Sequence, residues 1–228
     1  MQLNADFNRR AAVHAASLAW VPSPMPGVER RLLDRVGAEV ARATTIVRYA
    51  PDSYFSPHTH DGGEEFLVID GVFQDERGDY PAGSYVRNPP TSRHTPRSTK
   101  GCSIFVKLWQ FAPDDRTQVR VDTSRQSFLP VADRPGVAEV PLFRDEREQV
   151  RLERWEPDSV ISLEVPGGIE ILVLEGTFND AIEDFSALSW LRLPDGEALR
   201  AKTGAQGCRL WVKTGHLAHV QTAPTQER

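Results

Sequence analysis

The chain contains an internal repeat, which constrains its fold more than any other feature of the sequence. Residues 62–73, GGEEFLVIDGVF, and residues 167–178, GGIEILVLEGTF, are identical at seven of twelve positions, with an offset of 105 residues. A period of this length is the size of a small domain and is too long for the unit of a solenoid. We therefore expect two similar domains in tandem, 1–120 and 121–228, with their boundary in the polar stretch 113–135.

Each copy is a succession of short apolar runs. The first contains ATTIVRYA, EEFLVIDG and CSIFVKLWQF, and the second contains IEILVLEG, ALSWLRLP and CRLWVKTG. Runs of β-branched and aromatic residues that are broken by Gly, Pro, Asp and Asn are typical of strands. The expected fold class is therefore all-β, with an antiparallel sandwich or barrel in each domain. One helical turn is expected, within residues 11–18.

Composition excludes several classes of partner. The formal charge is −5 at pH 7, and no basic run occurs that could follow a phosphate backbone, so we expect no nucleic-acid partner. The chain shows neither the apolar core of a signal peptide nor ~18 consecutive apolar residues, so we expect a cytoplasmic protein without a membrane partner. Cys102 and Cys208 occupy one slot of the repeat, and we interpret them as apolar core residues rather than as a disulfide or a zinc site.

Three potential metal ligands crowd into the stretch SPHTHDGGEEF at residues 56–66. His58 and His60 are two residues apart, so they lie on one face of an extended strand. Glu64 and Glu65 are adjacent and must point to opposite faces. Only one of the two glutamates can therefore join the histidines.

Comparison with the second copy selects Glu64. Glu65 is matched there by Glu170, so it remains where the histidines are absent and is more typical of a structural residue. A further histidine, His94, is also replaced by an aliphatic residue in the second copy. Aliphatic residues replace all four polar ones in the second copy, namely Leu163, Val165, Ile169 and Leu199 for His58, His60, Glu64 and His94. Unsatisfied polar groups inside a barrel would cost free energy, so we expect the first domain to bind an ion and the second to be packed.

The metal site that the sequence predicts consists of His58, His60, Glu64 and His94. Three imidazole nitrogens and one carboxylate oxygen can hold one divalent ion and leave one or two positions for water or substrate. The same nitrogen and oxygen ligands accept several metals. Zinc, iron, manganese and nickel therefore remain alternatives for a single bound ion.

The spacing of these residues is similar to that of a known family. The two signature motifs of the cupin superfamily resemble the pattern His58-x-His60-x3-Glu64-x6-Gly71, followed by Pro81-x-Gly83 and His94. More narrowly, HDGGEEFLVIDGVFQDERGDYPAGSYVRNPP and GCSIFVKL resemble the ChrR-type cupins, named for the metal-binding C-terminal domain of a bacterial anti-sigma factor. The resemblance covers residues 20–111 and, more weakly, the second copy.

This resemblance implies a bicupin, with two jelly-roll barrels and a metal ion held by the four residues named above. Catalytic relatives of this type resemble acetylacetone-cleaving and dihydroxyacetophenone dioxygenases. The chain lacks the N-terminal helical zinc domain of the anti-sigma factor, so sigma-factor binding is not expected. The diketone-cleaving type has a three-histidine site, to which Glu64 is an addition.

Three functions are compatible with these residues. The first is a non-haem, metal-dependent, dioxygenase-like enzyme that acts on a small carbonyl or enol compound, for which no catalytic residue besides the ligands can be named. The second is a ChrR-like regulatory cupin, related to the anti-sigma factor, that senses a metal or ligand without catalysis. The third is a scaffold that the ion stabilises. The expected partner is a small-molecule ligand, and a homodimer is left open.

Residues outside the expected site receive structural interpretations. His216 and His219 lack a third ligand, and we interpret them as part of a solvated tail, while His14 has no partner in the sequence. Scaffold roles are expected for the residues that recur in both copies, Arg87 with Arg192 and Lys107 with Lys213. The orientation is left open for Phe73, Tyr85 and Trp109.

Overall fold

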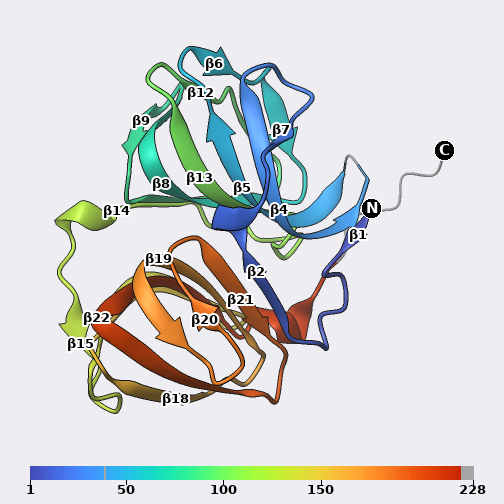
Figure 1. Cartoon of the computed structure of the whole chain (residues 1–228). Coiled ribbons are helices and arrows are strands. Elements are labelled where there is room, and N and C mark those ends of the chain that lie inside the picture. Colours follow the sequence, from blue (N-terminus) through green and yellow to red (C-terminus); the bar gives the residue numbers. More distant parts are fainter. Residues whose placement is uncertain (39, 222–228) are drawn as a thin grey trace. The chain divides into compact units, whose positions relative to one another are not determined.

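Antiparallel strands form nearly all the regular structure of the chain (Figure 1). The computed structural model describes residues 1–38 and 40–221. These residues divide into two units, the first built mainly from Leu18–Arg125 and the second from Asp6–Ser17 together with Gln126–Val220. The expected all-β fold with two similar domains is confirmed. The division at 120/121 stays a prediction, and the units differ from it because residues 6–17 belong with the second.

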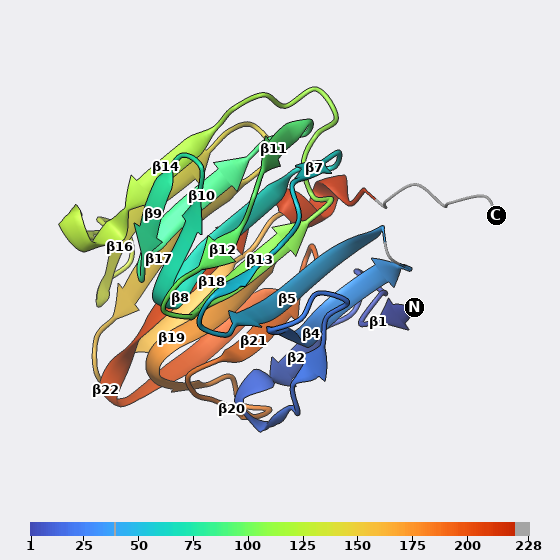
Figure 2. The same ribbon diagram turned by 90° about the horizontal axis from the view of Figure 1, so that it is seen from above.

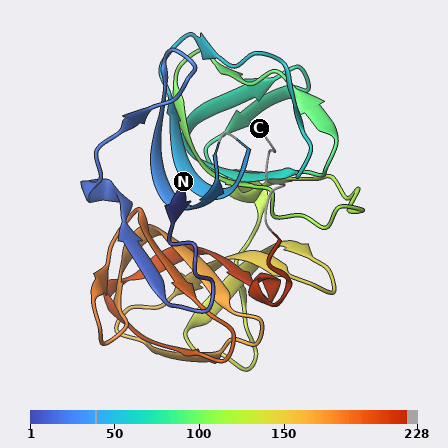
Figure 3. The same ribbon diagram turned by 90° about the vertical axis from the view of Figure 1, so that its right-hand side faces the viewer.

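The first unit is a strongly curved antiparallel sheet with one additional two-stranded sheet. Figure 3 shows its strands curving around a common centre. The main path runs in the order β1-β4-β5-β13-β8-β10-β14, and β7 and β11 form a separate two-stranded sheet. The strands of this unit are β1 (Gln2–Leu3), β3 (Val21–Pro22), β4 (Val28–Gly37), β5 (Ala41–Tyr49), β6 (Ser53–Tyr54), β7 (His58–His60), β8 (Glu64–Asp75), β9 (Gly78–Pro81), β10 (Ser84–Asn88), β11 (Ser92–His94), β12 (Arg97–Ser98), β13 (Cys102–Leu108) and β14 (Val119–Asp122).

The second unit repeats this arrangement in the order β15-β16-β17-β22-β19-β21-β2. Its long strand β22 corresponds to three separate strands of the first unit, β11, β12 and β13. The strands of this unit are β2 (Ala11–His14), β15 (Leu129–Pro130), β16 (Val137–Arg144), β17 (Gln149–Trp155), β18 (Val160–Glu164), β19 (Ile169–Asn179), β20 (Asp184–Phe185), β21 (Ser189–Leu193) and β22 (Ala198–Thr214).

The helical segments of the described chain are short 3-10 turns of three or four residues, η1 (Ala15–Ser17), η2 (Thr123–Arg125) and η3 (His216–His219). None of them has the length that a bilayer-spanning helix requires. The helical turn expected within residues 11–18 is present only as η1. The residues before it form β2, which pairs with β21 of the second unit.

The repeated glycines allow two backbones to approach closely. A Cβ atom on Gly71 would lie 2.1 Å from the carbonyl oxygen of Gly101, and one on Gly176 would lie 2.0 Å from that of Gly207. Both Gly71 and Gly176 have a positive φ. No other residue fits this position without displacing the neighbouring strand, so the repeat of these glycines is structural.

The alternation of side chains along β8 places Glu64 and Glu65 on opposite faces, as predicted. Phe66 and Val68 share the face of Glu64 and belong to the core of the first unit. Glu65 lies instead opposite Arg87 of β10 and Lys107 of β13. All three charged residues are buried, and the Tyr85 hydroxyl donates a hydrogen bond of 2.8 Å to Glu65.

The second unit has the same three charges at equivalent places. Glu170 of β19 lies opposite Arg192 of β21 and Lys213 of β22, and all are buried. These registers agree with the scaffold role expected for the recurring basic residues. Cys102 and Cys208 are also buried core residues, and burial raises the pKa of their thiols to about 11 and about 12 respectively.

The interior of the second unit holds a buried carboxylate with an unusually complete set of donors. Glu153 of β17 is fully buried and accepts two hydrogen bonds from Arg134, at 2.6 and 2.7 Å. Arg151 Nε and Trp155 Nε1 each donate a further bond of 2.6 Å. Burial raises the pKa of Glu153, but the hydrogen bonds and charges of Arg134 and Arg151 outweigh it and lower the pKa below its ordinary value.

We expect Glu153→Gln to reduce the free energy of unfolding by about 3–5 kcal/mol, because it leaves two arginines without their buried carboxylate. The lowered pKa means that the wild-type contribution is fully present above the unfolded pKa near 4.5 and is lost as the pH falls through the folded value. Urea denaturation at pH 7 and at pH 4 measures both effects. The matched control is Glu164→Gln, because Glu164 and its partner Arg200 are mostly exposed. Equal losses in the two variants would contradict this account.

Candidate metal centre

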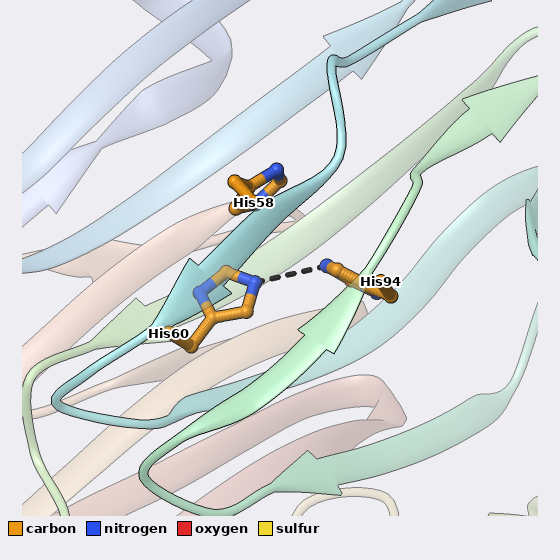
Figure 4. Close-up of side chains that lie close together, drawn as sticks. All are labelled: His58, His60 and His94. Carbon is orange, nitrogen blue, oxygen red and sulfur yellow. Dashed lines mark hydrogen bonds between the residues drawn. The ribbon is translucent and has the colours of Figure 1, made fainter.

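A short antiparallel pair of strands carries the three histidines. Figure 2 shows β7 and β11 side by side. They pair so that His94 lies directly opposite His58, and Ser92 lies opposite His60. Residues two apart on β7 share a face, and His94 lies on the same face of the partner strand. The three side chains therefore point toward one another, as Figure 4 shows.

The ligand atoms of this group lie within reach of a single ion. His58, His60 and His94 each offer a nitrogen atom, and these atoms all lie within 4.8 Å of one another. His60 Nε2 and His94 Nε2 are 2.9 Å apart. No second group of this kind is found in residues 1–38 and 40–221.

Glu64 joins the group from the first position of β8. Its Oε2 atom is 3.4 Å from His60 Nε2 and 3.5 Å from His94 Nε2. The amide nitrogen of Asn88, which lies opposite Glu64 on β10, donates a hydrogen bond of 3.2 Å to the same oxygen. The structure thus brings Glu64 to the histidines, whereas Glu65 lies on the other face.

These separations fit ligands of one metal ion. With metal–nitrogen bonds of about 2.0–2.1 Å, neighbouring ligand atoms lie about 2.9 Å apart in an octahedral site and about 3.4 Å apart in a tetrahedral one. The observed distances of 2.9, 3.4 and 3.5 Å among His60, His94 and Glu64 lie in or within 0.1 Å of this range. The donor set of imidazoles and one carboxylate suits zinc, iron, manganese or nickel. The assignment of the four residues as ligands stays a prediction that this geometry supports.

Burial and mutual repulsion keep part of this group in the protonation state that a metal needs. Burial lowers the pKa of His60 to about 4, with the charges of His94 and His58 acting in the same direction. Burial also raises the pKa of Glu64, but His60 and His94 outweigh it, so the pKa is lowered overall. At neutral pH, His60 is therefore neutral with a free lone pair, and Glu64 is an anion.

A second carboxylate lies behind His94. Asp75, the last residue of β8, is buried, and its Oδ2 atom is 3.5 Å from His94 Nδ1. Its Oδ1 atom accepts hydrogen bonds from the Tyr80 hydroxyl, at 3.2 Å, and from the Arg77 amide, at 2.7 Å. Burial lowers the pKa of His94, but Glu64 and Asp75 outweigh it and raise the pKa. A carboxylate facing Nδ1 favours a proton there and leaves Nε2 free to bind an ion.

His58 is oriented by the backbone. The carbonyl oxygen of Ser56 lies 2.8 Å from His58 Nδ1, so a proton on Nδ1 is donated to it and Nε2 remains available. An acceptor oxygen thus faces the far nitrogen of two of the three histidines, at 2.8 Å for His58 and at 3.5 Å for His94.

His58, His60 and Glu64 border a cavity of about 280 Å³ in the first unit. Its walls are largely apolar, and the side chains include those of Val47, Tyr49, Phe55, Ile104 and Trp109. A concave apolar site with a few convergent polar groups is the usual form of a small-molecule site. The metal ligands would therefore face a space that a small organic molecule can enter.

The three residues whose orientation the sequence left open take different positions. Phe73 is a core residue, and its ring lies 6.0 Å from that of His94. Trp109 lines the cavity and packs on Gly62, where a Cβ atom would lie 2.1 Å from the indole ring. Tyr85 is on the opposite face with Glu65.

Two histidines outside the site have surroundings that differ from those expected from the sequence. His216 is buried, with Nε2 3.4 Å from Glu170 Oε1, so its assignment to a solvated tail is wrong. His14 has partners that are distant in sequence, because its ring nitrogens lie 3.0 Å from Ser189 Oγ and 2.7 Å from Glu183 Oε2.

Asn88 and Asp75 are not among the site residues that the sequence predicts. Asn88 could have been identified, because Leu193 replaces it at the same offset of 105 residues at which the predicted ligands become aliphatic. Asp75 could not, because the second copy has an aspartate, Asp180, at the equivalent place.

Fold and site together define a protein of the bicupin class, and comparisons with known proteins agree. The model of the ChrR cupin-like domain matches the sequence twice, at residues 8–112 and 116–218. The chain therefore belongs to the family of ChrR cupin-like proteins. None of the curated proteins shows a significant match.

Several solved structures share the fold. A protein from Nostoc punctiforme PCC 73102, described as a candidate dioxygenase, is 15% identical, with a TM-score of 0.76 over 97% of this chain and 88% of its own. YlbA from Escherichia coli is 16% identical, with a TM-score of 0.68 over 92% and 93%. The pirin YhhW from Escherichia coli, in complex with nickel(II), is 15% identical, with a TM-score of 0.64 over 91% and 99%. At these identities the likeness shows the fold alone.

The two adjacent glutamates provide a direct test of the site. We expect Glu64→Gln to weaken metal binding sharply, because a charged ligand becomes a neutral amide. Glu65→Gln should leave metal binding unchanged and lower the free energy of unfolding by about 3–5 kcal/mol, because Arg87 and Lys107 remain buried. Metal competition titration and urea denaturation of both variants separate these effects. Loss of the ion in Glu65→Gln alone would show that the assignment of faces along β8 is reversed.

Asp75→Asn should lower metal affinity by about 10–100-fold, because the amide no longer holds the Nδ1 proton of His94 as a carboxylate does. The matched control is Asp79→Asn, since Asp79 is exposed and bonded only to Gln74 in the described interactions. Competition titration with a chromogenic chelator measures both. Equal affinities for the two variants would exclude a role of Asp75 in positioning His94.

Proposed function

We propose that the chain is a metal-dependent enzyme of the dioxygenase type that acts on a small carbonyl or enol compound. The observation that carries this proposal is the group of His58, His60 and His94, because the first two of these histidines lie on the wall of a largely apolar cavity. A purely structural ion has no need of such a space. The candidate dioxygenase from Nostoc punctiforme and the nickel-bound pirin, both of the same fold, support it.

In this proposal the three histidines and Glu64 hold the ion, which would supply Lewis acidity toward an enolate and, if it is iron, chemistry with oxygen. The protein's own groups do the rest. Asp75 fixes the His94 tautomer, and Asn88 holds one oxygen of Glu64. The apolar walls exclude water, which strengthens electrostatic interactions between the site and a bound substrate.

Binding of one ion per chain is expected, because the second unit has aliphatic residues at the equivalent positions. Leu199, Val165 and Ile169 are buried in its apolar core, and Leu163 packs against it. Leu163 and Leu199 are opposite one another on β18 and β22, as His58 and His94 are on β7 and β11.

The experiment is oxygen uptake by protein purified anaerobically and loaded in turn with iron(II), manganese(II), nickel(II) and zinc(II). We expect turnover of a β-diketone or a hydroxyaryl ketone by one of the redox-active forms, at one metal per chain. His60→Ala should abolish metal binding and turnover, whereas His219→Ala, at an exposed histidine, should change neither. One zinc per chain without turnover of any compound would favour the regulatory or scaffold function, and two ions per chain would contradict the assignment to the first unit.

A further inference from the structure

Arg30 is a charged residue on the inward face of the first unit. β4 and β5 pair so that Val28 lies opposite Tyr49, and Arg30 lies opposite Val47. Val28, Val47 and Tyr49 all belong to the apolar core cluster. Side chains two apart and directly across share a face, so Arg30 points to the same side as these core residues. It lines the cavity that His58 and His60 border.

The guanidinium of Arg30 has few hydrogen-bond partners within the protein. Its Nε atom is buried and has no hydrogen-bond partner, and its Nη2 atom donates only one long bond, of 3.4 Å, to the carbonyl oxygen of Pro22. No ion pair joins Arg30 to a carboxylate in the described residues. In the nearby pair of Arg48 and Glu29, by contrast, Nη2 lies 2.5 Å from Oε2. Placing a charge on an apolar wall without a partner costs free energy. A residue that carries such a cost is a candidate for ligand binding.

The other charged groups around the cavity do not compensate Arg30. Glu64 is directed to His60 and His94, and Asp61 lies in the turn after β7 and has no ion pair with Arg30 in the described residues. Arg30 is therefore a cation without a carboxylate partner among the described residues that line the cavity, and it can accept an anionic group there.

The second unit provides an internal comparison. Glu139 occupies the place of Arg30, since it lies two residues after Val137, which pairs with Trp155 as Val28 pairs with Tyr49. Glu139 has a basic neighbour, because Arg151 Nε is 3.5 Å away. The inward charge is thus paired in the unit without the histidines and unpaired in the unit that has them.

We propose that Arg30 binds the carboxylate of the substrate, so that the substrate class is a small oxo acid. Its carbonyl or enolate oxygens face His58, His60 and His94, and its carboxylate is bound at the opposite wall by the arginine fork. A cavity of about 280 Å³ admits an apolar chain or ring of roughly ten non-hydrogen atoms between these two ends. This inference rests on the proposed function, because it takes the histidine group as the site of the reacting oxygens.

The test uses a matched pair of probes, 4,6-dioxoheptanoate and its methyl ester, which share the diketone and differ in charge. Isothermal titration calorimetry with the zinc-loaded protein measures the affinity of each. We expect the acid to bind at least tenfold more tightly than the ester, as expected for a hydrogen bond to a charged group. Arg30→Met should reduce the affinity for the acid to that for the ester and leave the ester and the zinc content unchanged.

Two further variants sharpen this test. Arg30→Lys keeps the charge but loses the bidentate fork, so it should retain part of the preference for the acid. Arg31→Met is the matched control, because Arg31 lies on the opposite face of β4, with its guanidinium 4.3 Å from the Trp20 ring, and should retain the full preference. The melting temperature of Arg30→Met should equal or exceed that of the wild type, because an unpaired charge is removed from an apolar wall.

The outcomes distinguish this inference from the proposed function. If the zinc-loaded wild type binds the ester as tightly as the acid, or if Arg30→Met keeps the preference for the acid, Arg30 does not bind a carboxylate while the metal-dependent function stands. A lower melting temperature of Arg30→Met together with unchanged discrimination would assign Arg30 a structural role instead. If no zinc binds, or if the loaded protein binds neither probe, the proposed function fails and the inference fails with it.

Discussion

The pleat of β8 is the constraint on which the site depends. It assigns two adjacent glutamates to two environments, Glu64 to the histidines inside the first unit and Glu65 to the buried basic residues on the other face. Each face would be disrupted by a shift of one residue, because every side chain of the strand would exchange faces. Two buried charge networks, on opposite sides of one strand, therefore fix the same register and hold Glu64 beside His60 and His94.

The two units show two ways of placing polar groups inside the same fold. In the second unit Glu153 is buried with donors from Arg134, Arg151 and Trp155, so its charge is balanced within the protein. In the first unit the Arg30 Nε and His94 Nδ1 atoms are buried without a hydrogen-bond partner. Unsatisfied buried groups are unfavourable for folding and useful for binding, since an ion or ligand can supply the missing partner. This difference agrees with the proposal that the first unit binds an ion or ligand.

The sequence predicted the all-β fold, the repeat and the inward face of β8, because all three follow from local periodicity and from the comparison of two copies. The comparison selected Glu64 because the second copy changed there while Glu65 was kept as Glu170. Periodicity did not predict that residues 6–17 would join the second unit, since pairing between β2 and β21 joins residues far apart in the chain. It also missed the burial of His216, which depends on contacts with Glu170.

A comparison of the two internal copies does not detect every residue of the candidate site. It detects a residue of the candidate site only where the copies differ, as at Asn88 and Leu193. Asp75 and Asp180 are identical in type, yet Asp75 faces His94 while Asp180 pairs with Arg10. Identity in the two copies thus indicates a shared backbone position rather than a shared role. The role of such a residue follows from the partner that the surrounding strands bring to it, and only the three-dimensional structure supplies that partner.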